Sequence, residues 1–173
     1  MEEWDVYDRR GIATGKTKKR NDVFLEDEYH LGASLWILDS QGRMLIQKRA
    51  PSKRIHPNKW GHPGGAVQAG EKSEQGCVRE VEEEIGLKLD VRDITLFSRV
   101  FQNDSIYDDY FVIFDFPIEN AVLPENEVSE IKWATIEEVR ELYIAGQFMT
   151  DDIAGLDHAL ARIQAEAFRR RCS

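Results

Sequence analysis

Three glutamates near the middle of the chain, Glu80, Glu83 and Glu84, have the residue type and spacing of a metal site. With a turn of about 100° per residue, they fall within about a 100° sector of a helix. Like charges at this spacing cost roughly 0.2–0.5 kcal/mol per pair, so a facing cation would stabilise the cluster. Carboxylate oxygens favour Mg²⁺, with Mn²⁺ as the second choice, and such an ion polarises phosphorus and activates water.

The glutamates belong to a longer pattern with fixed spacing. Gly65 is followed after five residues by Glu71, and after seven more by the run Arg79-Glu80-Val81-Glu82-Glu83-Glu84-Ile85-Gly86-Leu87. A solvated helix face is often acidic, because glutamate forms helices well. The nine specified positions would coincide by chance in a chain of this length with odds on the order of one in ten million. The pattern therefore favours a catalytic site over a solvated surface.

This pattern matches the Nudix box in full, so the sequence resembles the Nudix hydrolases, with the box at residues 65–87. The resemblance implies an α/β/α sandwich with a mixed central sheet. It also implies that Glu80, Glu83 and Glu84 bind magnesium with Gly64 beside them, and that one glutamate, with Glu83 and Glu80 as candidates, acts as general base. The usual reaction of the family is attack of water on a nucleoside diphosphate linked to another group.

Residues beside the triplet have supporting roles. Arg79, which we include among the catalytic residues, is expected to brace a glutamate by a charge-assisted hydrogen bond. Gly64 and Gly65 allow the backbone to approach a metal or phosphate closely. These roles complete the expected centre around the helix.

Charged residues outside the box are expected to complete the site. Nudix hydrolases commonly draw a further carboxylate from the region after the last long strand, where Glu125 and Glu127 lie. We assign Glu127 as a base or metal ligand, with a solvated acidic loop as the alternative. Within the basic residues from 48 to 59, Arg49 and Lys53 are expected to bind substrate phosphate, and some of the others belong to the surface.

The flanking segments resemble type I isopentenyl-diphosphate isomerases and the Nudix hydrolases similar to them. The resemblance rests on Trp4–Asp8, Thr14–Lys16, Tyr29–Leu31, Ile46–Lys53 and Glu125–Val128. Such an isomerase needs a cysteine immediately before Gly61-His62-Pro63, where this chain has Trp60, and its box is degenerate, whereas this box is intact. We therefore expect a magnesium-dependent pyrophosphohydrolase of a nucleoside di- or triphosphate or a related diphosphate compound. The isomerase is the alternative, and a non-catalytic nucleotide-sensing module, which the intact triplet disfavours, is the third hypothesis.

Two histidines and two cysteines leave choices open. His30 and His62 match positions where the isomerases place metal-binding histidines, and hydrogen-bonded structural histidines are the alternative. Cys77 lies on or beside the apolar side of the box helix, which indicates a small buried thiol. It is about a hundred residues from Cys172, with no partners at metal spacing, so neither a disulfide framework nor a zinc site is indicated.

Periodicity and turn residues predict the elements that position these groups. A helix is expected from Ser73 to Gly86, where positive φ is favoured, with an apolar side at Cys77, Val78, Val81 and Ile85. Strands are predicted at residues 4–8, 31–38, 43–49, 94–100, 110–116 and 131–133. Further helices are predicted after Thr135, with Glu138 at the capping-box position, and over residues 151–171. Residues 16–20 and 50–62 are predicted as loops.

Composition limits the remaining possibilities. At 173 residues and 42% hydrophobic content, residues 1–173 are expected to form one Nudix domain. The 23 basic and 32 acidic residues give a net charge of −9, which disfavours nucleic acid and anionic membranes as partners. No secretory signal or run of ~18 apolar residues is present, so we expect a cytoplasmic protein that binds a small nucleotide or diphosphate. Nudix enzymes often form homodimers, which leaves the oligomeric state open.

Overall fold

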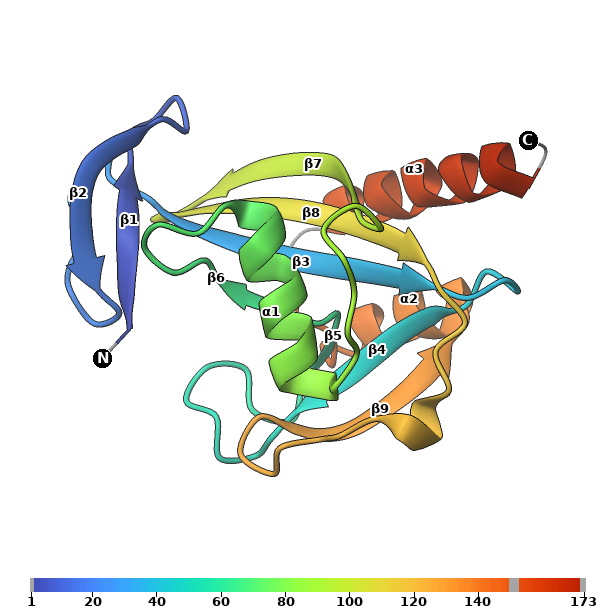
Figure 1. The fold of residues 1–173 in the computed structure, drawn as a ribbon. Helices are drawn as coiled ribbons and strands as arrows, with labels where there is room; N and C mark the ends of the chain where they lie inside the picture. Colours follow the sequence, from blue (N-terminus) through green and yellow to red (C-terminus); the bar gives the residue numbers. More distant parts are fainter. Residues whose placement is uncertain (1, 150–152, 172–173) are drawn as a thin grey trace.

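The computed structural model describes residues 2–149 and 153–171, and its helices cover both faces of one large mixed sheet (Figure 1). The strands are β1 Glu3–Tyr7, β2 Ala13–Lys19, β3 His30–Leu38, β4 Met44–Arg49, β5 Trp60–Gly61, β6 Gly64–Ala66, β7 Thr95–Gln102, β8 Ser105–Ile113 and β9 Val128–Ala134. The helices are α1 Ser73–Ile85, α2 Ile136–Ile144 and α3 Ile153–Arg171, with a 3₁₀ turn at Ile118–Asn120. Helix α1 lies on one face and α2 and α3 on the other, which confirms the predicted α/β/α sandwich.

The central strand β3 is buried on both faces. Leu35 and Ile37 pack into the core under α1, whereas Trp36 and Leu38 pack into the core under α2 and α3. The exposed fraction of each of these four residues is 4% or less. This two-sided burial explains why the strand is an almost unbroken apolar run in the sequence. Its parallel pairing with β8 and antiparallel pairing with β6 make the sheet mixed, as predicted.

Strands β3 and β4 diverge, and a later segment fills the space between them. They pair with each other at Leu38 and Met44, next to their connecting turn. Beyond that point Trp60–Gly61 pairs with β4, and Gly64–Ala66 pairs with β3. Because β8 and β9 occupy the other edges of β3 and β4, the segment from Trp60 to Ala66 lies in the gap. The sheet therefore delivers the backbone of Gly64 to the face that α1 covers.

Helix α1 confirms the predicted start at Ser73 and end before Gly86. Gly86 has a φ of 74°, and its N–H donates to the carbonyl of Glu82 at 2.9 Å, which closes the last turn. Cys77, Val81 and Ile85 are fully buried against the sheet. The glutamates project from the remaining helix surface, and Glu84, with 5% exposure, also lies against the sheet, where it contacts Gln47 and Gly64.

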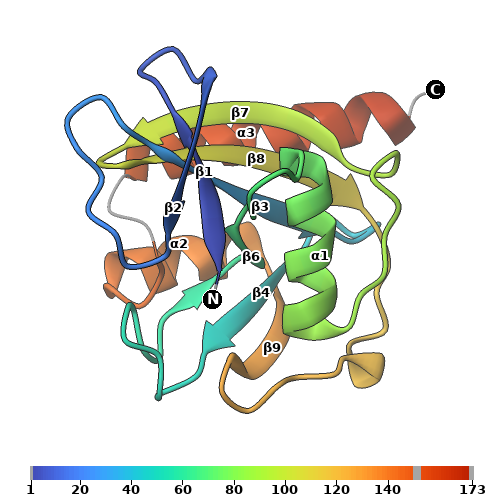
Figure 2. The ribbon, with the colours of Figure 1, turned by 60° about the vertical axis from the view of Figure 1, so that its left-hand side comes forward.

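The basic segment 16–20 was predicted as a loop, and this prediction is wrong. Residues up to Lys19 belong to β2, which pairs antiparallel with β1 to form a separate two-stranded sheet at one side of the molecule (Figure 2). The strand is stabilised by its distant partner β1, and nearly all of its side chains are exposed or half-buried. An exposed strand has no apolar alternation for the sequence to display.

Several element ends differ from the predicted boundaries. Strand β8 starts at Ser105 and ends at Ile113, because it pairs with β3 along its whole length, from His30 to Leu38. Strand β9 starts earlier than predicted, at Val128, where it pairs with Arg49. The capping box at the start of α2 is confirmed. The expected start of α3 at residues 151 and 152 lies outside the described residues. No helix in the described part of the chain is long and apolar enough to cross a membrane.

Replacing Ile85 with alanine should lower the free energy of unfolding by about 2–5 kcal/mol, because it leaves a cavity under α1. Replacing Ile144, which is 76% exposed on α2, should change it by less than about 0.5 kcal/mol. Urea unfolding of both variants measures the difference. Equal effects would contradict this account of the core.

Candidate active site

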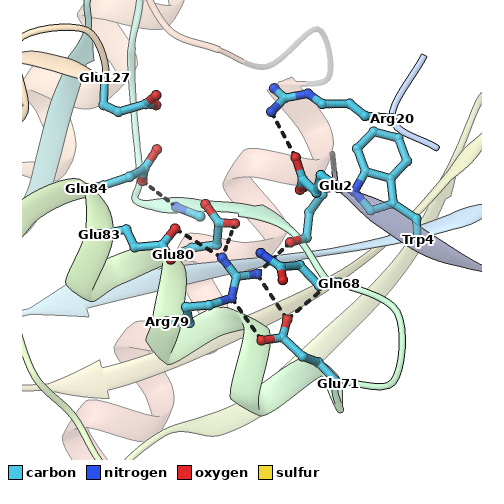
Figure 3. A network of polar contacts seen from close by, with 12 residues as sticks. Glu2, Trp4, Arg20, Gln68, Glu71, Arg79, Glu80, Glu83, Glu84 and Glu127 are labelled. Carbon is cyan, nitrogen blue, oxygen red and sulfur yellow. Dashed lines mark hydrogen bonds and ion pairs between the residues drawn. The ribbon is translucent and has the colours of Figure 1, made fainter.

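A cleft of about 230 Å³ lies between α1, the loop after β4 and the N-terminal hairpin, and we call it the glutamate cleft (Figure 3). It is lined by Glu2, Arg20, Arg49, Lys53, Gly64, Gly65, Ala66, Gln68, Arg79, Glu80, Glu83, Glu84 and Glu127. Every residue that the sequence predicted for catalysis, metal binding or phosphate binding lies in this lining. The structure thus brings together groups from four separate segments of the chain.

Glu84 is the buried member of the triplet, with an exposed fraction of 5%. Its Oε2 accepts the backbone N–H of Gly64 at 2.9 Å and the side-chain Nε2 of Gln47 at 2.6 Å. Burial raises the pKa of Glu84 to about 7, although both hydrogen bonds oppose the shift. A carboxyl in this position is fixed in orientation and has been removed from bulk water.

Gly64 and Gly65 give the helix room to approach the sheet. A Cβ on Gly64 would collide with the carbonyl of Ala33, and a Cβ on Gly65 would collide with the carboxylate of Glu80. Glycine is therefore required at position 64 for β6 to lie against β3, whereas at position 65 it leaves space for the carboxylate of Glu80. The close approach also brings the N–H of Gly64 within bonding distance of Glu84.

Arg79 contacts three carboxylates. Its guanidinium donates to Glu71 at 2.9 and 3.0 Å, to Glu80 at 2.7 Å and to Glu83 at 3.1 Å, and it also binds the carbonyl of Ala66. Partial burial disfavours the charge on Arg79, but the bonds to Glu71 and Glu80 outweigh it and raise the pKa. Burial likewise opposes ionisation of Glu71, yet Arg79 lowers the pKa of that carboxyl. Arg79 thus has the bracing geometry that the sequence predicted.

Glu80 and Glu83 differ in their surroundings. Burial raises the pKa of Glu80, although the charge and hydrogen bond of Arg79 oppose the shift. The side chain of Glu83 is 57% exposed at the mouth of the cleft. The triplet therefore contains one buried carboxyl, Glu84, one half-buried carboxyl, Glu80, and one exposed carboxyl, Glu83, that Arg79 contacts at 3.1 Å.

The donor set of the cleft fits a hard divalent cation. It offers carboxylate oxygens from one helix face beside the backbone of Gly64 and Gly65, which carry no side chain. As the side chains stand, no three carboxylate, histidine or cysteine groups among the described residues converge on one point. Arg79 lies between Glu80 and Glu83, and Glu84 faces Gln47 and Gly64. Of the three glutamates, Glu83 is the one whose exposure leaves its side chain room to turn toward Glu80 and Glu84.

Cationic groups reach the cleft from the end of β4 and from the loop that follows it. Lys53 forms an ion pair with Glu127, and Arg49 donates through Nε to the carbonyl of Ile55 at 3.1 Å. Neighbouring lysines have other positions: Lys48 pairs with Glu130, and the lining includes only Arg49 and Lys53 of the predicted basic group. An anion in the cleft would meet these two cations.

Comparison with known proteins places these observations in a family. Residues 28–151 match the model of the NUDIX domain. A Nudix hydrolase of Listeria monocytogenes is 35% identical over 152 residues, which cover 86% of this chain and 89% of the relative. The chain belongs to the Nudix family. Its Nudix hydrolase relatives identify it as a hydrolase that acts on phosphorus-containing acid anhydrides.

Two further relatives bear on the isomerase resemblance and the Nudix fold. An isopentenyl-diphosphate Δ-isomerase of Escherichia coli is 26% identical over 155 residues, which cover 78% of this chain and 77% of the isomerase. The crystal structure of a Deinococcus radiodurans protein matches with a TM-score of 0.75 and 26% identity, covering 93% of this chain and 98% of that one. The isomerase resemblance is thus real in sequence, and the structural match confirms the sandwich.

His30 and His62, whose roles the sequence left open, lie outside the lining of the glutamate cleft. His30 stacks on Trp4 with ring centroids 4.4 Å apart, and its Nε2 lies 2.8 Å from the hydroxyl of Ser105. His62 packs against Trp36 with ring centroids 4.8 Å apart. These contacts are those of structural histidines.

Sequence reasoning missed four lining residues, Glu2, Arg20, Ala66 and Gln68, and the supporting residue Gln47. Gln47 is 1% exposed, and the signal for it was a polar residue at the end of the apolar run from Met44 to Ile46. Glu2 and Arg20 come from the two ends of the N-terminal hairpin. No local pattern indicated them, because their position depends on the pairing of β1 with β2.

Cys77 should resist alkylation in the folded protein, in a Cys172→Ser background. Burial raises the pKa of the Cys77 thiol to about 12, so only about one molecule in ten thousand carries the thiolate at pH 8. We expect labelling by iodoacetamide at pH 8 to be at least about a hundredfold slower than in guanidinium chloride. Labelling of the native protein at the unfolded rate would show that this thiol is available.

Proposed function

We propose that this Nudix hydrolase is a magnesium-dependent pyrophosphohydrolase, with Mn²⁺ as an alternative ion. Its substrate is a nucleoside di- or triphosphate or a related small diphosphate compound. The observation that carries the proposal is the shared cleft: the carboxylates of α1 face the same space as the cations Arg49 and Lys53. A metal-bound phosphate chain requires this combination of acidic and basic groups.

Each glutamate of the triplet has a role that follows from its surroundings. Glu80, Glu83 and Glu84, with the backbone of Gly64, would hold the ion, and Arg79 would maintain the orientation of the helix carboxylates. When bound, Mg²⁺ supplies charge that polarises the phosphorus and lowers the pKa of a coordinated water. Glu83 is exposed at the cleft mouth and is our first candidate for the general base.

Glu80 and Glu127 are the other candidates for the base. Glu127 lies across the cleft from α1, and its ion pair with Lys53 holds it close to the phosphate-binding region. Arg49 and Lys53 would bind the phosphate oxygens and stabilise the charge on the leaving phosphate.

The isomerase hypothesis has less support. Carbon protonation of that type requires an accessible thiol, and the lining of the glutamate cleft contains no cysteine among the described residues. Trp60 stands where that cysteine would be and is 6% exposed within the core under α2 and α3. Cys77 is fully buried, with its pKa raised to about 12 by burial.

Two broader proposals accompany the activity. We propose that residues 1–173 form a single Nudix domain, since strands from both ends of the chain contribute to the cleft and its supporting sheet. We also propose a cytoplasmic enzyme, because Cys77 is a free buried thiol that suits a reducing compartment.

The activity test is incubation with Mg²⁺ and a panel of nucleoside tri- and diphosphates, dinucleoside diphosphate compounds and isopentenyl diphosphate. Chromatography should resolve hydrolysis products from at least one phosphate compound. Replacing Glu83 or Glu84 with glutamine should lower kcat/KM at least about a hundredfold, because each removes a carboxylate from the ion and base cluster.

Glu82→Gln is the matched control for this test. Glu82 lies on the same helix but pairs with Lys88 and does not line the cleft, so its loss should change kcat/KM less than about threefold. Isomerisation of isopentenyl diphosphate without cleavage of any phosphate bond would reject the hydrolase proposal. Binding without turnover of any compound would favour the sensing module.

A further inference from the structure

The N-terminal hairpin supplies a wall of the glutamate cleft that lies outside the matched NUDIX residues 28–151. Glu2 and Arg20 stand at the open end of the hairpin, where the backbone N–H of Arg20 donates to the carbonyl of Glu2 at 3.2 Å. Both side chains face the cleft. In Figure 3, Arg20 and Glu127, the ion-pair partner of Lys53, lie apart on the same side of the helix glutamates, with Arg20 towards Glu2 and Glu127 towards Glu84.

The hairpin is fixed to the loop that leads into α1. The N–H of Ala69 donates to the carbonyl of Glu3, and the N–H of Gly70 donates to Asp5, both at 2.8 Å. Trp4, which is 8% exposed, anchors the same strand by stacking on His30. These contacts hold the hairpin at a defined position beside the helix.

Glu2 orients the guanidinium of Arg20. Its carboxylate accepts the indole N–H of Trp4 at 3.0 Å with one oxygen and Arg20 Nη1 at 3.0 Å with the other. A carboxylate held by two donors cannot turn away, so Arg20 is directed along one side of the cleft.

Arg20 is less compensated by carboxylates than Arg79, the arginine of the lining that lies among the helix glutamates. Arg79 contacts three carboxylates, whereas the guanidinium of Arg20 contacts one within the part of the chain that the structure describes. Its side chain is 61% exposed, and most of its N–H donors point to solvent or the cleft. Such a group can bind a phosphate without breaking the contacts that brace the catalytic helix.

We propose that Arg20 is a specificity-determining residue that binds a phosphate on the hairpin side of the glutamate cleft, away from Arg49 and Lys53. This inference rests on the proposed pyrophosphohydrolase function. Cations then lie at two separate places in the cleft, so a chain of three phosphates contacts both groups, whereas a diphosphate contacts the Arg49 and Lys53 side alone. The enzyme therefore prefers triphosphate substrates over the corresponding diphosphates through Arg20.

The test compares kcat and KM of Arg20→Ala and Arg20→Lys on a nucleoside triphosphate and on its diphosphate, with Mg²⁺. For Arg20→Ala we expect kcat/KM on the triphosphate to fall about tenfold to a hundredfold, mainly through KM, because a charge-assisted contact is lost. The value on the diphosphate should change less than about threefold. Arg20→Lys keeps the charge but loses the planar fork of the guanidinium. Its kcat/KM on the triphosphate should therefore lie between those of the wild type and Arg20→Ala.

Arg10→Ala is the matched control on the same hairpin. Arg10 pairs with Asp8, is 71% exposed and does not line the cleft, so its removal should leave kcat/KM on both substrates unchanged. Equal losses on the two substrates, or the same effect from Arg10→Ala, would overturn the proposal. Thermal melting of each variant shows whether it folds. If Arg20→Ala does not fold, Arg20→Lys provides the test: a ratio of triphosphate to diphosphate kcat/KM equal to that of the wild type overturns the proposal.

A binding measurement separates this proposal from the proposed function. If the wild-type enzyme hydrolyses nothing in the panel, the hydrolase proposal fails, and calorimetry with inorganic tripolyphosphate and with pyrophosphate still tests Arg20. Arg20→Ala should weaken tripolyphosphate binding about tenfold or more while changing pyrophosphate binding less than about threefold. Equal weakening of both ligands, or no weakening, would overturn the subsite.

Discussion

The buried carboxylate of Glu84 is the interaction on which the rest of the site depends. Glu84 is 5% exposed. Burial makes the charged form of such a carboxyl unfavourable by about several kcal/mol unless hydrogen-bond donors of the protein replace water. Gly64 and Gln47 provide those donors, from β6 and β4 respectively. Gly64 can reach Glu84 because the segment from Trp60 to Ala66 fills the gap between two diverging strands. The sheet geometry and the position of the helix are therefore set by the same contact.

The charge balance of the cleft follows from this arrangement. Five glutamates and four cations line one space, and Arg79 contacts two of these carboxylates, Glu80 and Glu83, as well as Glu71 outside the lining. This compensation keeps the metal-free cluster compatible with folding. It also leaves the other cations at the periphery, in positions where phosphate oxygens rather than carboxylates can become their partners. In the proposed complex, the acidic centre thus binds the cation of the ligand, and the cations around it bind the phosphates of the same ligand.

The parts of the fold and site that the sequence predicted are those governed by local patterns. The bounds of α1 follow from apolar spacing and Gly86, and the direction of its glutamates follows from helix geometry. Arg49 and Lys53 line the cleft, as expected from the segment Ile46–Lys53, which resembles the isopentenyl-diphosphate isomerases and the Nudix hydrolases similar to them. The strand at residues 13–19 was missed because its stabilising partner is a distant strand and its surface is exposed. Gln47 and Arg20 were missed for the same reason, since each acquires its role from a contact with a segment remote in sequence.

The most direct test of the account is to titrate the wild type, Glu84→Gln and Glu82→Gln with Mn²⁺. Calorimetry and electron paramagnetic resonance measure the binding. The control Glu82 lies on the same helix, pairs with Lys88 and lies outside the cleft. If the held carboxylate of Glu84 binds the ion, its variant should bind Mn²⁺ at least about tenfold more weakly, while Glu82→Gln retains wild-type affinity. Equal Mn²⁺ affinity in all three proteins would contradict the account.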